Sequence, residues 1–200
     1  MTTTIWPSIK DIERYHKKYA PNQKVFDLVY GHCQIVAEIA LWCSGNLNIK
    51  IDNHLLQTAA LLHDIGSYAF FNDAGQNTNS RLYPQHAILG AKILEDEGVN
   101  ETINSVVATH VLLGLSKQEI IDKPWYLPEH DYQPSTIEGE LLCYADCFHS
   151  KHPTFNSYQT YLNGLRQNLP IQGDKFALWS KRFGIPDIDS LAYKYSQPVR

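Results

Sequence analysis

Residues 62–66 read Leu-His-Asp-Ile-Gly and place a histidine beside an aspartate at the end of an apolar stretch. Apolar residues between positions 55 and 60 recur at the spacing of one helical face, which predicts a helix that runs up to this pair. Because neighbouring side chains on a helix point about 100° apart, His63 and Asp64 can reach one common partner only near a helix end. The glycine that closes the stretch is a typical helix stop and predicts such an end here.

The same helical period recurs along the whole chain, and no alternating run is long enough to predict a strand. The predicted helices run over residues 8–19, 24–43, 52–63, 84–97, 100–111, 135–149, 158–165 and 174–183, with a single turn at 116–121. Two long connections, 66–83 and 114–133, separate them, and loops of this length are typically functional or disordered. We therefore predict an all-α fold in one domain, residues 1–200, with a core over about 25–150 and a helical appendage over about 151–200.

The composition is that of a globular protein. Apolar residues make up 44% and charged residues 19%, and the formal net charge is −4. This charge argues against binding nucleic acid through broad phosphate neutralisation, although a local basic pocket can still bind a small phosphorylated molecule. No stretch approaches the roughly 18 apolar residues that a membrane helix needs, so we expect no membrane partner. Residues 1–7 lack the features of a signal peptide, and we expect a cytoplasmic protein. The sequence leaves the oligomeric state open, and a homo-oligomer is compatible with it.

Polar side chains interrupt the apolar faces of five consecutive predicted helices. They are His32, His63, Asp64, His86, His110 and Asp146. A single histidine in a core is most often a hydrogen-bonded structural residue, but a buried carboxylate without a partner is strongly unfavourable. A shared cation removes this cost, and imidazole with carboxylate is a ligand set of Zn, Fe, Mn, Co or Ni. Cysteine is absent from the set, which argues against a structural zinc site. The pattern therefore predicts a buried metal centre.

The order of these residues, with positions 62–66 forming a His-Asp-Ile-Gly box, resembles the HD-domain superfamily. Members of that superfamily are all-helical and metal-dependent, and most are phosphohydrolases. The resemblance covers about residues 25–150, and the stretch from Thr136 to Asp146 is similar to the last ligand helix of small stand-alone members. It implies that one divalent metal ion is bound by His32, His63, Asp64 and Asp146.

A subset of the superfamily has two further histidines, and His86 and His110 stand where that subset has them. The resemblance then implies a second ion, with Asp64 bridging the two. His63 and Asp64 are accordingly the residues that we expect to be essential for catalysis. The number of ions, one or two, and their identity among Fe, Mn, Co, Ni, Zn and Mg stay open, because affinity order and metal availability both contribute.

The resemblance implies hydrolysis of a phosphate ester or anhydride of a small, nucleotide-like substrate by a metal-activated hydroxide. Ser67 stands where the cyclic-dinucleotide phosphodiesterases of the superfamily usually have lysine, and the loop after it has no Gly-Tyr-Pro motif. These departures argue against cyclic di-GMP as the substrate. One alternative is a di-iron oxygenase, because some six-ligand members resemble myo-inositol oxygenase. Another alternative is a non-catalytic module that binds a metal or a nucleotide.

Candidates for binding the substrate phosphate lie close to the predicted ligands in sequence. Arg81 lies in the long loop that precedes His86, and Lys151 and His149 follow Asp146. A cation near the metal centre would neutralise phosphate oxygens as charge develops on them. We therefore expect Arg81, Lys151 and His149 to contribute to substrate binding.

Overall fold

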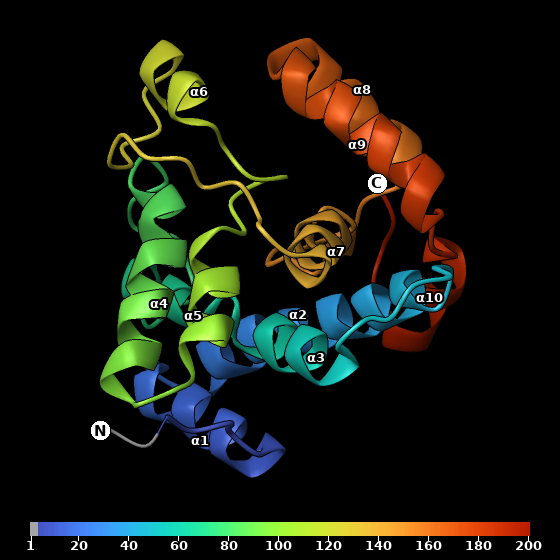
Figure 1. Cartoon of the computed structure of the whole chain (residues 1–200). Helices are drawn as coiled ribbons and strands as arrows, with labels where there is room; N and C mark the ends of the chain where they lie inside the picture. Colours follow the sequence, from blue (N-terminus) through green and yellow to red (C-terminus); the bar gives the residue numbers. More distant parts are fainter. Residues whose placement is uncertain (1–3) are drawn as a thin grey trace.

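The computed structural model describes residues 4–200, and its secondary structure is almost entirely helical (Figure 1). The α-helices within these residues are α1 (Ile9–Tyr19), α2 (Gln23–Ser44), α3 (Asn53–Leu62), α4 (His86–Asp96), α5 (Glu101–Ala108), α6 (Lys117–Asp122), α7 (Ile137–Asp146), α8 (Tyr158–Asn168), α9 (Pro170–Phe183) and α10 (Ile188–Tyr195). Two short 3₁₀ helices, η1 (Ile65–Phe70) and η2 (Tyr83–Gln85), precede α4. A hairpin of two-residue strands, β1 (His149–Ser150) and β2 (Thr154–Phe155), follows α7. The all-α prediction is confirmed.

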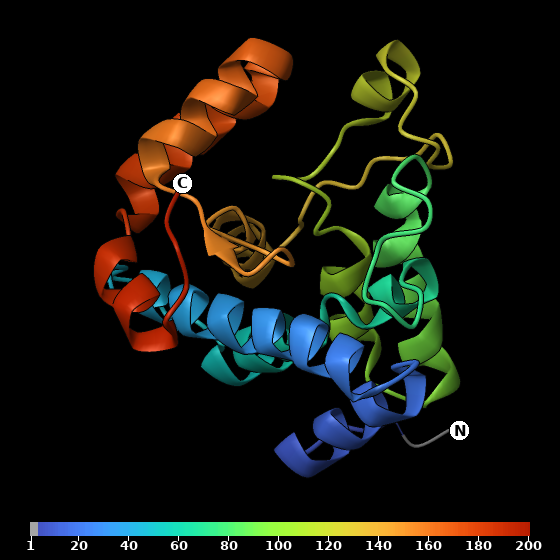
Figure 2. The ribbon, with the colours of Figure 1, turned by 180° about the vertical axis from the view of Figure 1, so that it is seen from behind.

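Helix α2 runs across the whole molecule, with α4 and α5 near one end and α10 near the other (Figures 1 and 2). Helices α3 and α7 pack against α2 and against each other, and α5 contacts both α3 and α4. Helices α8 and α9 form a pair that contacts α7 through α9. Fully buried side chains from α2, α3 and α7 form the centre of the core, among them Val36, Leu56 and Leu141. This packing places the middle of α2, and with it His32, at the junction of the helices.

Side-chain caps fix where several helices begin. Asn22 accepts a hydrogen bond from the backbone N–H of Val25, and Asp52 accepts two from the first turn of α3. Ser135 and Glu138 have the spacing of a capping box, but the N-cap of α7 is Thr136. The carboxylate of Glu138 instead accepts a hydrogen bond from the backbone N–H of Asp52 at 2.8 Å. It thereby ties the start of α7 to the start of α3.

Some boundaries differ from the sequence prediction. Helix α5 ends at Ala108, so His110 lies just beyond the helix and not on its face as predicted. Helix α4 begins at His86, because the residues before it form η2. Helix α10 was not predicted, and within it only Ile188 and Ala192 are buried, which leaves a weak apolar pattern. The single turn predicted at 116–121 is the short helix α6.

Gly66 has a different role from the helix stop that the sequence suggests. The chain continues beyond it as η1, and its φ angle does not lie in the left-handed region. An added Cβ would lie 2.1 Å from the backbone oxygen of His86 and 2.3 Å from the backbone nitrogen of Gly90. Gly66 is therefore required because η1 and α4 pack backbone against backbone, and this contact fixes His86 relative to His63 and Asp64.

By length and hydropathy alone, α2 could span a membrane, which the sequence prediction did not anticipate. Most of its apolar window is buried inside the fold, as in the central helix of a globular protein. The expectation that the chain has no leader rests on residues 1–7, of which residues 1–3 lie outside the described residues.

Candidate metal centre

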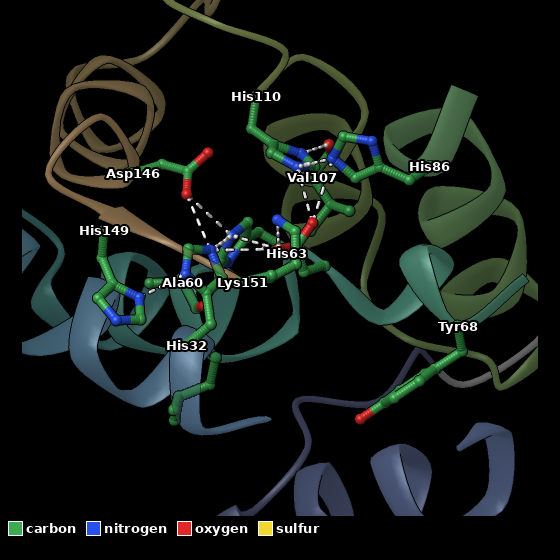
Figure 3. A network of polar contacts seen from close by, with 12 residues as sticks. His32, Ala60, His63, Tyr68, His86, Val107, His110, Asp146, His149 and Lys151 are labelled. Atoms are coloured by element: carbon green, nitrogen blue, oxygen red, sulfur yellow. Dashed lines mark hydrogen bonds and ion pairs between the residues drawn. The ribbon is translucent and has the colours of Figure 1, made fainter. Parts of the chain in front are cut away.

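The six residues singled out by their polarity converge at one place in the fold (Figure 3). His32 comes from the middle of α2, whereas the others come from helix ends: His63 and Asp64 after α3, His86 at the start of α4, His110 after α5 and Asp146 at the end of α7. His63 and Asp64 are fully buried, and His32 and His110 are 1% exposed. Because α3 ends at Leu62, the adjacent residues His63 and Asp64 can face the same point, which neighbours inside a helix cannot do.

The carboxylate of Asp64 lies between two groups of side chains. Its Oδ2 atom lies 3.2 Å from Nε2 of His32 and 3.3 Å from Nε2 of His63. Its Oδ1 atom lies 3.1 Å from Nε2 of His86 and 3.7 Å from Nε2 of His110. Oδ1 of Asp146 joins the first group, 2.9 Å from His32 and 3.5 Å from His63. Each group has the ligand types and the proximity that could hold a metal ion, and Asp64 belongs to both.

In three of the histidines, a hydrogen bond from Nδ1 to a backbone carbonyl oxygen turns Nε2 toward Asp64. Nδ1 of His63 lies 2.7 Å from the carbonyl oxygen of Ala60, and His86 and His110 make the same contact with the residue three positions earlier. A carbonyl oxygen only accepts hydrogen bonds, so each Nδ1 carries the hydrogen. In the neutral imidazole, each Nε2 then offers a lone pair toward the centre of the cluster.

These lone pairs point at one another at short range. The Nε2 atoms of His86 and His110 are 2.8 Å apart, and those of His32 and His63 are 3.2 Å apart. The buried Oδ1 atom of Asp64 accepts no hydrogen bond within the described residues, despite its short distance to His86. Unprotonated nitrogens facing an unsatisfied carboxylate oxygen fit a divalent cation in each group, because a cation satisfies all of these atoms together.

The electrostatics of the cluster favour ionised carboxylates and a neutral His110. Burial alone would raise the pKa of Asp64, but Lys151 and the surrounding histidines hold it well below its usual range. Burial also opposes ionisation of Asp146, but the adjacent His32 and His63 outweigh it and lower the pKa of Asp146. Burial lowers the pKa of His110 to about 4, so this imidazole is neutral at pH 7. Burial opposes protonation of His63, but the charge of Asp64 outweighs it and raises the pKa of His63 above its usual range. A metal ion bound at this nitrogen would take the place of that proton.

The structure brings two of the three predicted substrate-binding residues to the cluster. The ammonium group of Lys151 contacts Asp64 Oδ2. Partial burial of Lys151 opposes its charge, but the charge of Asp64 keeps the pKa of this lysine above its usual range. His149 lies behind His32, with 2.8 Å between their Nδ1 atoms. Arg81 is exposed, and its guanidinium lies 4.2 Å from the ring centre of Tyr126. It does not line the cavity beside the cluster.

That cavity has a volume of about 280 Å³ and opens next to Asp146 and Lys151. Sequence reasoning named only Asp146, His149 and Lys151 of its lining, and among the residues that it missed are Tyr83, Asn156 and Arg200. The Tyr83 ring stacks on His86, and its buried hydroxyl has no hydrogen-bond partner among residues 4–200. Nε of Arg200 donates to the side-chain oxygen of buried Asn156 at 2.6 Å, and Arg200 has no ion pair within the described part of the chain. Only the three-dimensional fold brings these residues to the cluster, because no periodic pattern marks them.

The sequence matches the HD domain family over residues 29–151, and the chain belongs to this family. Its relatives include an uncharacterised protein of Methanocaldococcus jannaschii, 31% identical over 59% of this chain and 64% of that protein. A tRNA (cytidine(56)-2'-O)-methyltransferase of Thermoplasma volcanium is 31% identical over 76% of this chain and 40% of its own length. The corresponding protein of Picrophilus torridus is 32% identical over 60% and 31%. The chain thus spans less than two thirds of each relative.

Two solved structures share the fold. Both are of the HD domain of the L. monocytogenes phosphodiesterase PgpH, one of them in complex with cyclic-di-AMP. The first aligns with a TM-score of 0.55 over 92% of this chain and 98% of that chain, and the complex aligns with 0.56 over 94% and 99%. Sequence identity is 18% in both cases, so the likeness concerns the fold.

Proposed function

We propose that this protein is a metal-dependent phosphohydrolase that cleaves a phosphate ester or anhydride of a small, nucleotide-like substrate. The observation that carries the proposal is the position of Asp64, whose two oxygens each face a pair of histidine Nε2 atoms. Membership of the HD domain family supports it. In this proposal His32, His63, Asp64 and Asp146 hold one ion, and Asp64, His86 and His110 hold a second.

Two divalent ions bound here would lower the pKa of a coordinated water toward neutrality and neutralise phosphate oxygens. The protein contributes rigidity: the histidine rings are held by backbone carbonyls, and Asp64 is held between both groups. His63 and Asp64 are catalytic in this proposal, because Asp64 belongs to both groups and His63 beside it binds the first ion. Such fixed positions favour the transition state, since the ligands do not have to reorganise as charge develops.

Lys151 and Arg200 supply positive charge on the substrate side. Lys151 lies next to Asp64 and is 16% exposed, so its ammonium group reaches the cavity as well as the cluster. Arg200 lines the same cavity, and Asn156 fixes the direction of its guanidinium. The Tyr83 hydroxyl is free to donate a hydrogen bond to a substrate oxygen. Two cations and a neutral donor around one cavity suit a phosphorylated substrate.

The cavity favours a substrate of at most one nucleotide unit. Its volume of about 280 Å³ lies just below the range for small-molecule sites, roughly 300–1,000 Å³. The PgpH HD domain has been solved with cyclic-di-AMP, which supports a nucleotide-like ligand for this fold. Ser67 and the absence of a Gly-Tyr-Pro motif in the loop after it argue against cyclic di-GMP.

The test begins with metal content per chain, measured by elemental analysis on protein purified without chelator or affinity-tag metal. The protein is then stripped and reloaded with manganese, cobalt, magnesium or iron. Phosphate release is measured from p-nitrophenyl phosphate, bis(p-nitrophenyl) phosphate and a panel of nucleoside mono-, di- and cyclic phosphates. We expect close to two ions per chain and metal-dependent turnover that is lost in Asp64→Ala.

Two results would replace this proposal with an alternative from the sequence. Iron in the protein together with oxygen consumption and no phosphate release would identify a di-iron oxygenase. Nucleotide binding without turnover under every metal would identify a binding module. One ion per chain with full activity would retain the hydrolase and remove His86 and His110 from metal binding.

A further inference from the structure

Gln197 lies outside the matched family region, which ends at residue 151, yet its side chain contacts His149 at the edge of the candidate metal ligands. The segment that carries it is fixed on both sides. Helix α10 is tied to α2 because both Lys194 and Tyr195 donate hydrogen bonds to Glu38. On the other side, the backbone N–H of Phe155 donates to the oxygen of Pro198, and Val199 pairs with Phe155 in a parallel bridge. The Gln197 side chain therefore has a defined position beside β1.

A chain of hydrogen bonds connects Gln197 to His32 through His149. Oε1 of Gln197 lies 2.7 Å from Nε2 of His149, and Nδ1 of His149 lies 2.8 Å from Nδ1 of His32. The amide oxygen only accepts, so Nε2 of His149 carries the hydrogen. Nδ1 of neutral His149 then accepts, and Nδ1 of His32 must donate to it. This leaves Nε2 of His32 unprotonated, facing Asp146 at 2.9 Å and Asp64 at 3.2 Å.

His32 needs this arrangement because of its place in the fold. His63, His86 and His110 lie at or near helix ends and direct Nδ1 to the carbonyl oxygen three positions earlier. His32 lies in the middle of α2, where carbonyl oxygens accept hydrogen bonds within the helix. Its outer nitrogen therefore requires a side chain from elsewhere. Figure 3 shows His149 at the end of the cluster opposite His86, where it supplies that partner.

We propose that Gln197 is a positioning residue that sets the tautomer of His32 through His149 and so prepares the His32–His63–Asp64–Asp146 group for a divalent metal ion. The inference rests on the metal centre of the proposed function. The partners that orient a metal-binding histidine commonly change metal affinity by 10–100-fold when they are removed. The effect should be confined to this group, because His86 and His110 have their own backbone partners.

The test compares Gln197→Met, which has a similar length but no amide, with Gln197→Glu, which keeps an acceptor oxygen. Tyr193→Ala is the control, since Tyr193 lies in the last turn of α10, shortly before Gln197, and is 90% exposed. Manganese titration by calorimetry gives the affinity of each site. Long-range ¹H–¹⁵N spectra of the histidine rings, recorded with EDTA, give the tautomer of His32 without any metal.

We expect Gln197→Met to weaken one of two manganese sites by about 10–100-fold and to shift His32 away from the Nδ1–H tautomer. Gln197→Glu and Tyr193→Ala should match the parent. If Gln197→Met binds manganese like the parent and its His32 keeps the Nδ1–H tautomer, the inference is wrong while the metal centre stands. If the parent binds no metal, the proposed function fails, and the ring spectra still decide whether Gln197 controls His32.

Discussion

The Nε2 atoms of His86 and His110 lie 2.8 Å apart, and both face the same carboxylate oxygen of Asp64. Each of the two rings has its other nitrogen occupied by a backbone carbonyl. Two lone pairs and a carboxylate oxygen therefore meet in a buried space, which is the arrangement that a second metal ion would stabilise.

Removing one of these two histidines should cost one metal ion per chain. We expect His86→Ala or His110→Ala to retain the ion held by the first group and the helical content of the fold, because neither residue offers a ligand atom to that group. Asp64→Ala should lose both ions, since its carboxylate serves both groups. Elemental analysis and circular dichroism check this, with exposed His54→Ala as the control. Unchanged metal content in His86→Ala would contradict the two-ion arrangement.

Lys151→Met should reduce kcat by about 100-fold while the metal content stays the same. The ammonium group lies beside Asp64 and at the cavity, where it would neutralise charge that develops on a phosphate. The control is Lys92→Met, because Lys92 is exposed and pairs with Glu95 and Asp96 on the surface. Steady-state kinetics on the best phosphate substrate are the measurement. Equal kcat values in the two variants would exclude Lys151 from catalysis.

Arg200→Gln should raise KM by about 10-fold and leave kcat within about twofold, since a hydrogen bond from a charged group contributes roughly 1.5–3 kcal/mol. Arg200 lies on the cavity wall and does not contact the predicted metal ligands. Arg14→Gln is the matched control, because Arg14 pairs with Asp11 on the exposed face of α1. A loss of kcat with unchanged KM would show that Arg200 does not bind the substrate in the ground state.

Gly66→Ala should lower the free energy of unfolding by about 3 kcal/mol or more and weaken the centre. The new Cβ would collide with backbone atoms of His86 and Gly90, so α4 would have to move. Gly164→Ala in α8 is the control, because nothing lies within 4 Å of its added Cβ. That substitution should stabilise the protein by about 0.5–1 kcal/mol through helix propensity. Urea unfolding of both variants is the measurement.

Buried His16 should make the protein less stable in acid. Its ring contacts the hydroxyl of Tyr68 and the carbonyl oxygen of Leu61, both at 2.8 Å. Burial lowers its pKa to about 4, whereas an unfolded histidine titrates near 6.5. Between these pH values the unfolded chain binds a proton that the folded chain does not, so stability falls as the pH drops from about 6.5 to about 4.

The size of this effect follows from the shift, about 3 kcal/mol across the window. We expect the difference in unfolding free energy between the parent and His16→Gln to shrink by that amount as the pH falls. Both proteins are unfolded in urea with excess EDTA, so that titration of the other histidines is common to them. Exposed His54→Gln should follow the parent. A pH-independent difference between the parent and His16→Gln would refute the assignment.

The sequence predicted the fold class because apolar residues recur at helical spacing, and it found six polar positions that the fold brings together. Buried histidines and aspartates stand out on an apolar face, so local pattern is enough to find them. The sequence predicted that His110 lies on a helix, but α5 ends at Ala108. The end of this helix depends on packing and not on the local sequence pattern. The loop position of Arg81 gave no information on where the guanidinium would lie.

The residues that sequence reasoning missed all reach the site through tertiary packing. Tyr83 stacks on His86, Asn156 lies after the β hairpin, and Arg200 follows a short helix with few buried residues. None of them interrupts an apolar stripe or belongs to a motif. The sequence analysis interpreted Gly66 as a helix stop, whereas the structure requires glycine there because the backbone packs closely against α4. A contact between distant segments leaves no local pattern in the sequence.

The contacts that build the centre join parts of the chain that are synthesised far apart. His32 and His149 are separated by 117 residues, and Asp64 and Lys151 by 87. Such contacts raise the contact order and form late, because large loops must close first. A nascent chain that has emerged only as far as α5 holds three of the four histidines of the centre but neither Asp146 nor Lys151. Metal capture is therefore coupled to completion of the fold and not to the appearance of its first motif.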